Sequence, residues 1–368
     1  MLHNILALTP WLLLSICSAV SWAQITPNIV DIHLSGFGMV RDSVSVSFQA
    51  AAKALGKDAD YEHLYLLSGN AFAPAIDTSE SCRSWWHVEA RMGTHNLPAM
   101  AASAGLVAQK LALPVLSASS TEEQKKANRQ SLSKLVIKAL KSGAVVMTEG
   151  GWDEAGGWVW SGVVTDVSDE GTIRGSAMSA VTGDGKVNVE WKYPGRLWAI
   201  RPGKIVTPAR KVDRFILSEG VIRIRGTGYY AAHGADRYGL SAMDQWIASM
   251  RDARGFCADC FKRSPVVGVQ DAPDNDKRMY EAARIVARQL RTGFSTLPAG
   301  AAQHVQKAAD CYDRIAVLLE PGATGKGGFT WDSLSSLEAQ RGYVEIVLEP
   351  VKTELERAAG YLEKALRY

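Results

Sequence analysis

The spacing of apolar residues predicts a helix near the start of the chain and several more toward its end. Between Ser43 and Leu55, apolar residues recur at intervals of three or four, which is typical of a helix with one buried face. The same spacing predicts further helices at 61–67, 99–111, 131–140, 240–250, 279–290, 305–319 and 344–366. Pro350 interrupts the last of these, so that it either kinks the helix or begins a new one.

The middle of the chain changes to the pattern of strands. Segments rich in β-branched and aromatic residues lie at 144–147, 158–167, 172–178, 186–191 and 196–200. Turns that contain glycine separate these segments, and we therefore expect an antiparallel meander over residues 144–201. The polar stretch 117–130 predicts a solvated connection that leads into the helix before the meander.

The first 23 residues have the form of a signal peptide. The apolar stretch from Ile5 to Ile16 is too short to span a bilayer, and Ser21 and Ala23 form a small-x-small cleavage site. We expect cleavage after Ala23 and export to the periplasm or the medium. Lipidation at Cys17 is the less favoured alternative, because Ile16 stands where a small residue is expected.

Composition limits the classes of partner. The 368 residues include 41 Lys and Arg against 38 Asp and Glu, a formal charge of +3, and 47% of the chain is hydrophobic. No later apolar run is long enough for a membrane helix. We therefore expect a folded protein of one large or two modest domains, with no nucleic-acid partner and no membrane span after signal cleavage.

Four cysteines remain after signal cleavage: Cys82, Cys257, Cys260 and Cys311. An even number in an oxidising compartment predicts two disulfides, and the sequence leaves all three connectivities open. The pair in CADC could serve redox chemistry, but no strand precedes it. Convergence of all four on zinc is a further alternative, which export disfavours. We predict no metal and no cofactor.

The order of elements, a glycine loop, a buried helix, further helices and a strand meander, resembles that of papain-like cysteine peptidases. The opening DSVSVSFQAAAKALG is similar to the DCGxAxLxxxLxxxG of bacterial double-glycine-type peptidases. The passages YLLSGNAF, LVIKALKSGAVVM and GLSAMDQWIASM resemble the butirosin biosynthesis protein H-like family, which shares that fold. The resemblance implies an α+β papain-like domain over 26–250, followed by a helical region over 251–368.

That family implies a cysteine nucleophile, used in peptide cleavage or in acyl transfer from a carrier protein to an amine. Here Ser43 stands at the cysteine position, and Trp160 and Ser161 stand where the histidine would be. No Asp follows in TIRGSAM, and SGFGMVR lacks the expected oxyanion glutamine. The thiol mechanism of the family therefore cannot operate in this chain.

Asp42 and Ser43 are the first candidate site residues, because they could act as a repurposed acid and nucleophile. Each is also a good helix N-cap, and we favour the cap. His87, or alternatively His95, could replace the missing base, although a histidine in a loop is more often a surface residue.

An aromatic group accompanies these candidates. Trp85, Trp86, Trp158 and Trp160, together with Trp152, fall on segments that line the cleft of a papain-like fold. They could form a stacking platform for a ligand, whereas core packing explains them at least as well.

We expect an exported, catalytically degenerate papain-like protein that binds a small molecule or a protein partner in the former active-site cleft. The alternative is a hydrolase or acyltransferase that uses Ser43 as nucleophile with a recruited histidine such as His87. A structural component of the cell envelope is a third possibility. An enzyme requires a base within hydrogen-bond reach of Ser43, whereas a binding protein requires only a groove.

Overall fold

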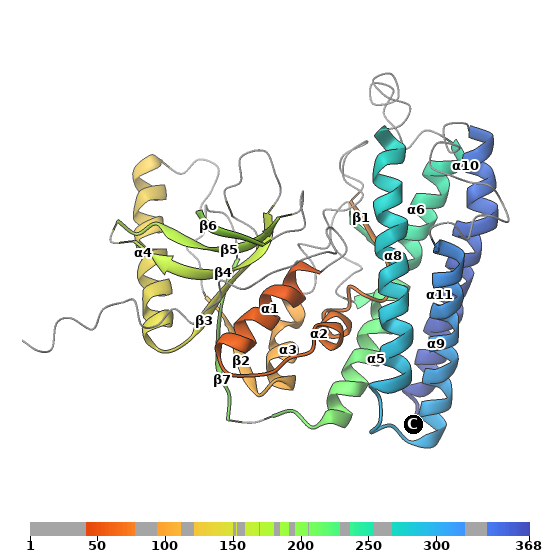
Figure 1. Ribbon diagram of the computed structural model, residues 1–368, viewed down its shortest axis with the longest axis horizontal. Coiled ribbons are helices and arrows are strands. Elements are labelled where there is room, and N and C mark those ends of the chain that lie inside the picture. Colours follow the sequence, from red (N-terminus) through yellow and green to blue (C-terminus); the bar gives the residue numbers. More distant parts are fainter. Residues whose placement is uncertain are drawn as a thin grey trace, which may run out of the picture.

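The chain has a mixed α+β fold in which all strand pairs of the described residues are antiparallel. The computed structural model describes residues 42–77, 94–111, 121–149, 152, 159–168, 170–179, 185–190, 196–204, 206–228, 236–252, 267–320 and 337–368. A twisted sheet with helices on its two faces stands beside a group of long helices (Figure 1).

Six strands form the main sheet: β2 (Leu106–Lys110), β3 (Val145–Glu149), β4 (Val159–Val167), β5 (Ile173–Ser179), β6 (Gly185–Glu190) and β7 (Arg196–Pro202). Their spatial order is β2-β7-β3-β4-β5-β6. The predicted meander therefore holds from β3 to β6 but is wrong for β7, which returns to lie between β2 and β3. Residues 197–200 are all buried, which suits a strand inside a sheet rather than at its edge. A separate pair joins β1 (Ala75–Asp77) to β8 (Asp236–Tyr238).

The two faces of the sheet pack against different helices. One face packs against α1 (Ser43–Ala54), and its apolar cluster includes Val44 and Phe48 of the helix with Val163 of β4. The opposite face packs against α4 (Glu122–Lys141) through Leu132 and Val136. Figure 1 shows α1 between the sheet and the long helices, with α4 at the far end of the molecule.

Two helices predicted before the strand region differ from the structure. The pattern at 99–111 divides into α3 (Leu97–Ser103) and strand β2, because Gly105 adopts a positive φ of 68° that ends the helix. The predicted connection before residue 131 belongs from Glu122 onward to α4, which begins at a capping box formed by Thr121 and Gln124. Among the residues of 122–131 whose exposure is described, none is buried, so no apolar spacing marks the first half of α4.

The C-terminal part consists of long helices that pack side by side. Its elements are α5 (Ala209–Arg225), α6 (Gly239–Asp252), α8 (Val267–Thr292), α9 (Ala299–Leu319), α10 (Leu337–Tyr343) and α11 (Glu349–Ala365). The helix α9 contacts both α8 and α11 extensively, and α11 also packs on α5. Within the described ranges, no helix combines the length and apolar character needed to cross a membrane.

In this part of the chain, the sequence predicted the helix around Pro350 but not α5. Pro350 follows a π-helical turn, Val344–Leu348, and Leu348 and Glu349 keep α-helical backbone angles, so the helix continues through the proline and does not begin anew there. The helix α5 was not predicted, and it contains a glycine at its centre. A Cβ on Gly220 would lie 2.9 Å from the ring of Phe72 and 3.1 Å from Leu362, so close packing on both sides of α5 requires glycine there.

The remaining α2 (Tyr61–Ser68) agrees with the predicted helix at 61–67. Asp60 caps its N-terminus by accepting a hydrogen bond from the backbone N–H of His63 at 2.9 Å. The helix packs between α1 and α5 and leads into the segment Gly69–Pro74, which is buried at the centre of the molecule.

Candidate functional site

The strongest candidate site lies at the N-terminus of α1, where polar side chains are buried against the sheet and the neighbouring helices. Asp42 is 1% exposed, Ser43 is 2% exposed and Ser45 is fully buried. Such polar groups are costly to bury unless they are hydrogen-bonded, so each contact in this region bears on what the site can do.

Asp42 is the N-cap of α1, as the sequence analysis favoured. Its carboxylate accepts hydrogen bonds from the backbone N–H of Ser45 at 2.8 Å, from the Ser45 hydroxyl, and from Asn70 Nδ2 at 2.8 Å. Its own backbone N–H donates to the Tyr61 hydroxyl at 3.0 Å. The carboxylate is thus engaged in holding the helix start and the segment after α2, which opposes a role as catalytic acid or base.

Ser43 is buried at the first position of the helix, and its hydroxyl has no hydrogen-bond partner among the described residues. It therefore makes no hydrogen bond to His95, the alternative base that the sequence suggested. A serine hydroxyl with an ordinary pKa needs an adjacent base before it can act as a nucleophile. His87, the other predicted base, lies outside the described residues.

A second buried hydroxyl without a partner belongs to Ser161, on the strand that contacts α1. Ser161 lies two residues before Val163, which packs against α1, so strand alternation turns Ser161 toward the same face. Across the sheet it is paired with Glu149 of β3, and Glu149 is paired with Arg196 of β7. These three polar residues form one row, in which Arg196 Nη1 lies 3.3 Å from Glu149 Oε1.

A chain of buried polar contacts extends from Asp42 toward α5. The Ser68 hydroxyl accepts a hydrogen bond from the backbone N–H of Asn70 at 3.2 Å. Asn96 Nδ2 donates to the carbonyl of Ser68 at 3.2 Å and to Glu219 Oε2 at 3.0 Å. His95 Nε2 lies 3.7 Å from the same Glu219 oxygen. His95 therefore belongs to a network centred on Glu219, at the junction of α2, α3 and α5.

The segment after α2 ties this network to the long helices. Tyr312 of α9 donates its hydroxyl to the carbonyl of Phe72 at 2.7 Å, and Arg223 of α5 donates Nε to the carbonyl of Ala73 at 3.1 Å. Burial raises the pKa of Tyr312 well above its usual value, so this hydroxyl remains a donor. Asn70 thereby lies between the cap of α1 and a backbone segment held by two other helices.

A second buried acid lies elsewhere on α5. Asp213 is 3% exposed, and Thr296 donates its hydroxyl to the carboxylate. Burial raises the pKa of Asp213, while the Thr296 hydrogen bond and nearby His63 act in the opposite direction. Burial also lowers the pKa of His63. This pair lies at the contact of α2 and α5, apart from the residues around Ser43.

The aromatic candidates divide into two groups. Trp85, Trp86 and Trp158 lie outside the described residues, and for Trp160 only the backbone, within β4, is described. Trp152 is 8% exposed and packs on the backbone of β4 and β5, where a Cβ on Gly162 or Gly175 would approach its ring within 2.8 Å. Core packing therefore accounts for Trp152.

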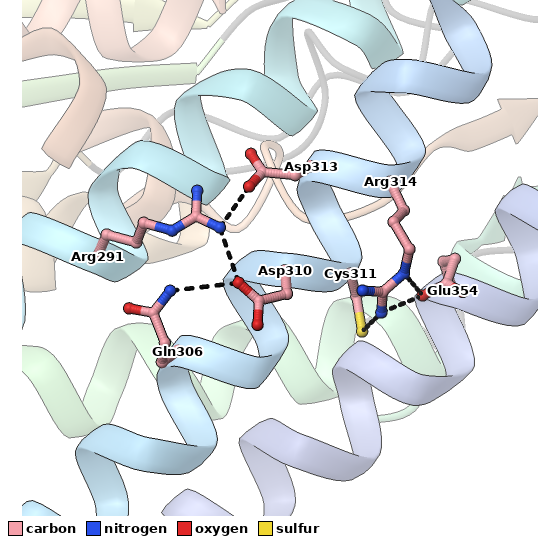
Figure 2. A network of polar contacts seen from close by, with 7 residues as sticks. All are labelled: Arg291, Gln306, Asp310, Cys311, Asp313, Arg314 and Glu354. Carbon is pink, nitrogen blue, oxygen red and sulfur yellow. Dashed lines mark hydrogen bonds and ion pairs between the residues drawn. The ribbon is translucent and has the colours of Figure 1, made fainter.

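Of the four disulfide candidates, Cys311 is a free, fully buried thiol on α9. It accepts a hydrogen bond from Arg314 Nη2 at 3.1 Å (Figure 2), and burial raises its pKa to about 12. The thiol is therefore protonated at neutral pH and is a poor nucleophile. Cys82, Cys257 and Cys260 lie outside the described residues, so any pairing among them stays a prediction.

Sequence reasoning identified Asp42 and Ser43 but not Asn70, Asn96, Glu149 or Glu219. Asn70 lies in a motif that the sequence analysis singled out, whereas Glu219 lies on the helix that it missed. A scan against protein-family models finds no match, and a search of curated proteins finds none either.

Proposed function

We propose that this chain is an exported papain-like protein that has lost cysteine–histidine chemistry and binds a small molecule or protein partner noncatalytically at the former active site. The observation that carries the proposal is the pair of buried hydroxyls without partners, Ser43 on α1 and Ser161 on β4. A papain-like fold would have its nucleophile at the start of the first helix and its histidine on a facing strand. The two serines occupy those elements.

Two neutral hydroxyls cannot perform the chemistry of a thiolate and an imidazolium. Neither serine can remove a proton from the other at neutral pH, and Asp42 is already held by Ser45 and Asn70. Each hydroxyl can still donate and accept hydrogen bonds, which suits recognition of a polar group such as an amide or a hydroxyl. Ser43 is 2% exposed and Ser161 is fully buried, so ligand entry requires the site to open.

The first experiment tests whether catalysis survives. The mature protein is treated with a serine-reactive fluorophosphonate, with Ser43→Ala as the matched control, and adducts are located by mass spectrometry. We expect no adduct at Ser43, because the structure provides no adjacent base among the described residues. An adduct that Ser43→Ala abolishes would support the alternative, a hydrolase or acyltransferase, and overturn the noncatalytic proposal.

The second experiment tests whether the site opens. Ser43→Cys is compared with Ser47→Cys, since Ser47 is 3% exposed and lies one turn further along α1. Each introduced cysteine is labelled with iodoacetamide between pH 7 and pH 10, and labelling is measured by peptide mass spectrometry. A helix N-terminus lowers the pKa of a thiol, so the rates are compared at high pH, where each rate no longer rises with pH. We expect residue 43 to react at least about tenfold faster than residue 47. Equal rates would contradict a binding site at Ser43.

A further inference from the structure

A groove of about 610 Å³ lies on the outer surface of the long helices, far along the chain from Ser43. It runs between α9 and α11, and its lining includes Arg314 and Val317 from α9 and Glu345, Glu349, Thr353 and Arg357 from the π-helical turn and α11. The two helices are antiparallel, since Arg314 contacts Glu354 whereas Lys307, earlier on α9, contacts Tyr361. Nothing in the proposed function uses this surface.

Charged residues line the groove in a graded order. Glu345, Glu349, Thr353 and Arg357 follow one another at intervals of four residues. Arg251 of α6 forms an ion pair with Glu349, so the acidic end of this wall is formed by Glu345 and the basic end by Arg357. At 1.5 Å per residue the two ends are about 18 Å apart. Glu345 is exposed, and no ion pair to it is found in the part of the chain that the structure describes.

At the basic end of the groove, α9 contributes a second positive charge, that of Arg314. Glu354 receives Arg314 Nη2 on one carboxylate oxygen and Arg357 Nη1 on the other, each at 2.7 Å (Figure 2 shows the Arg314 contact). Two guanidinium groups thus share one carboxylate, and this end keeps a net positive charge. The side chains of Arg314 and Arg357 are 50% and 59% exposed, so both are accessible to a partner.

One exposed apolar side chain lines the same groove, and another is next to the groove residue Glu345 in the sequence. Val317 on α9 is 63% exposed, and Ile346 in the π-helical turn is 52% exposed. In that turn the Glu349 N–H bonds to the carbonyl of Val344, five residues earlier, and such turns occur often at functional positions. Docking of a partner in the groove would remove the exposed Val317 side chain from water, which favours association.

We propose that a second copy of this chain docks on this groove through the same face, antiparallel to the first, about a two-fold axis that crosses α11 midway between Glu349 and Thr353. In that arrangement Glu345 meets the partner's Arg357, Glu349 meets the partner's Thr353, and each contact occurs twice. A partner for this groove must present the reverse charge order along a helix. A second copy of the groove in antiparallel orientation presents this reversed order, with its basic end beside the acidic end of the first copy.

Charge reversal gives a sharp test by sedimentation velocity of the mature protein. The wild type forms a dimer whose dissociation constant rises with salt. Glu345→Arg alone and Arg357→Glu alone each replace two attractive contacts by two repulsive ones, so each weakens the dimer by about tenfold or more. An equimolar mixture of the two variants restores the dimer, because every contact between the unlike copies is attractive.

The apolar part of the surface has a matched control. Val317→Asp weakens the dimer by about tenfold, whereas Val206→Asp, at a residue that is 62% exposed outside the groove, leaves it unchanged. Melting curves confirm that each variant is folded. A monomeric wild type at 500 µM, on the order of the weakest specific homodimers, would overturn the proposal. A dimer that neither reversal weakens would place the interface elsewhere, and a mixture that stays monomeric would exclude the two-fold geometry.

Discussion

The interior around α1 and the interior of the long helices are built from different side chains. Around α1, the acids and amides Asp42, Asn70, Asn96 and Glu219 are buried and joined by hydrogen bonds. Between α8, α9 and α11, the interior is mainly apolar and rich in alanine, and the ion pairs of Arg291 with Asp310 and Asp313 lie outside. Buried polar networks fix one arrangement of their elements, whereas alanine-rich helix contacts mainly supply close packing.

The largest effect should come from removing the cap of α1. Asp42→Ala leaves Asn70 and the helix start without their buried acceptor, and we expect a loss of about 3 kcal/mol in the free energy of unfolding. Asp60→Ala removes the corresponding cap of α2, which is solvent-exposed, and should cost only about 1 kcal/mol. Urea unfolding of both variants checks the difference. Equal losses would show that burial of the Asp42 network adds nothing to ordinary capping.

A smaller effect is expected from the ion pairs on the long helices. Arg291 of α8 lies 2.8 Å from Asp310 and also contacts Asp313, both on α9 (Figure 2). These carboxylates are nearly half exposed, so Arg291→Gln should cost no more than about 1 kcal/mol. The difference from wild type should vanish in 0.5 M NaCl. A loss comparable to that of Asp42→Ala would contradict the contrast between the two regions.

The smallest expected effect is an increase in melting temperature, caused by substitution of Asp213. Because burial raises the pKa of Asp213, its stabilising contribution is complete below the unfolded-state pKa and is lost as the pH rises through the folded-state pKa. Asp213→Asn keeps an acceptor for Thr296 without the buried charge. We therefore expect a higher melting temperature than wild type at pH 7 and a diminishing difference toward pH 3. A lower melting temperature at pH 7 would mean that His63 stabilises the charged form.

Local signals predicted local structure well. The α1 helix and its cap follow from residues 42–55 alone, because the capping oxygen and the apolar face lie within a few turns. The α+β class and strands β3 to β6 follow from alternation and turn residues in the same way. The position of β7 could not be predicted, since a strand buried on both faces pairs according to the whole sheet rather than to its own pattern.

The candidate site was only partly predictable for the same reason. Asp42 and Ser43 are adjacent in the sequence, whereas Asn96 and Glu219 are separated by 123 residues and meet only through folding. From the sequence, Ser161 was named only as one of two residues at the position where the resembled family has its histidine. Its relevance appears when strand register places it beside Glu149 and on the face of the sheet that packs against α1.

Gly220 in α5 limits which amino-acid substitutions this protein can accept during evolution. Two side chains pack against the backbone of α5 at Gly220. Phe72 comes from the segment after α2, and Leu362 comes from α11. Any larger residue there would have to displace both neighbours at once. The region around α1 and the long helices therefore pack on the same residue of α5. A substitution at Gly220 requires compensating substitutions on both sides of this helix.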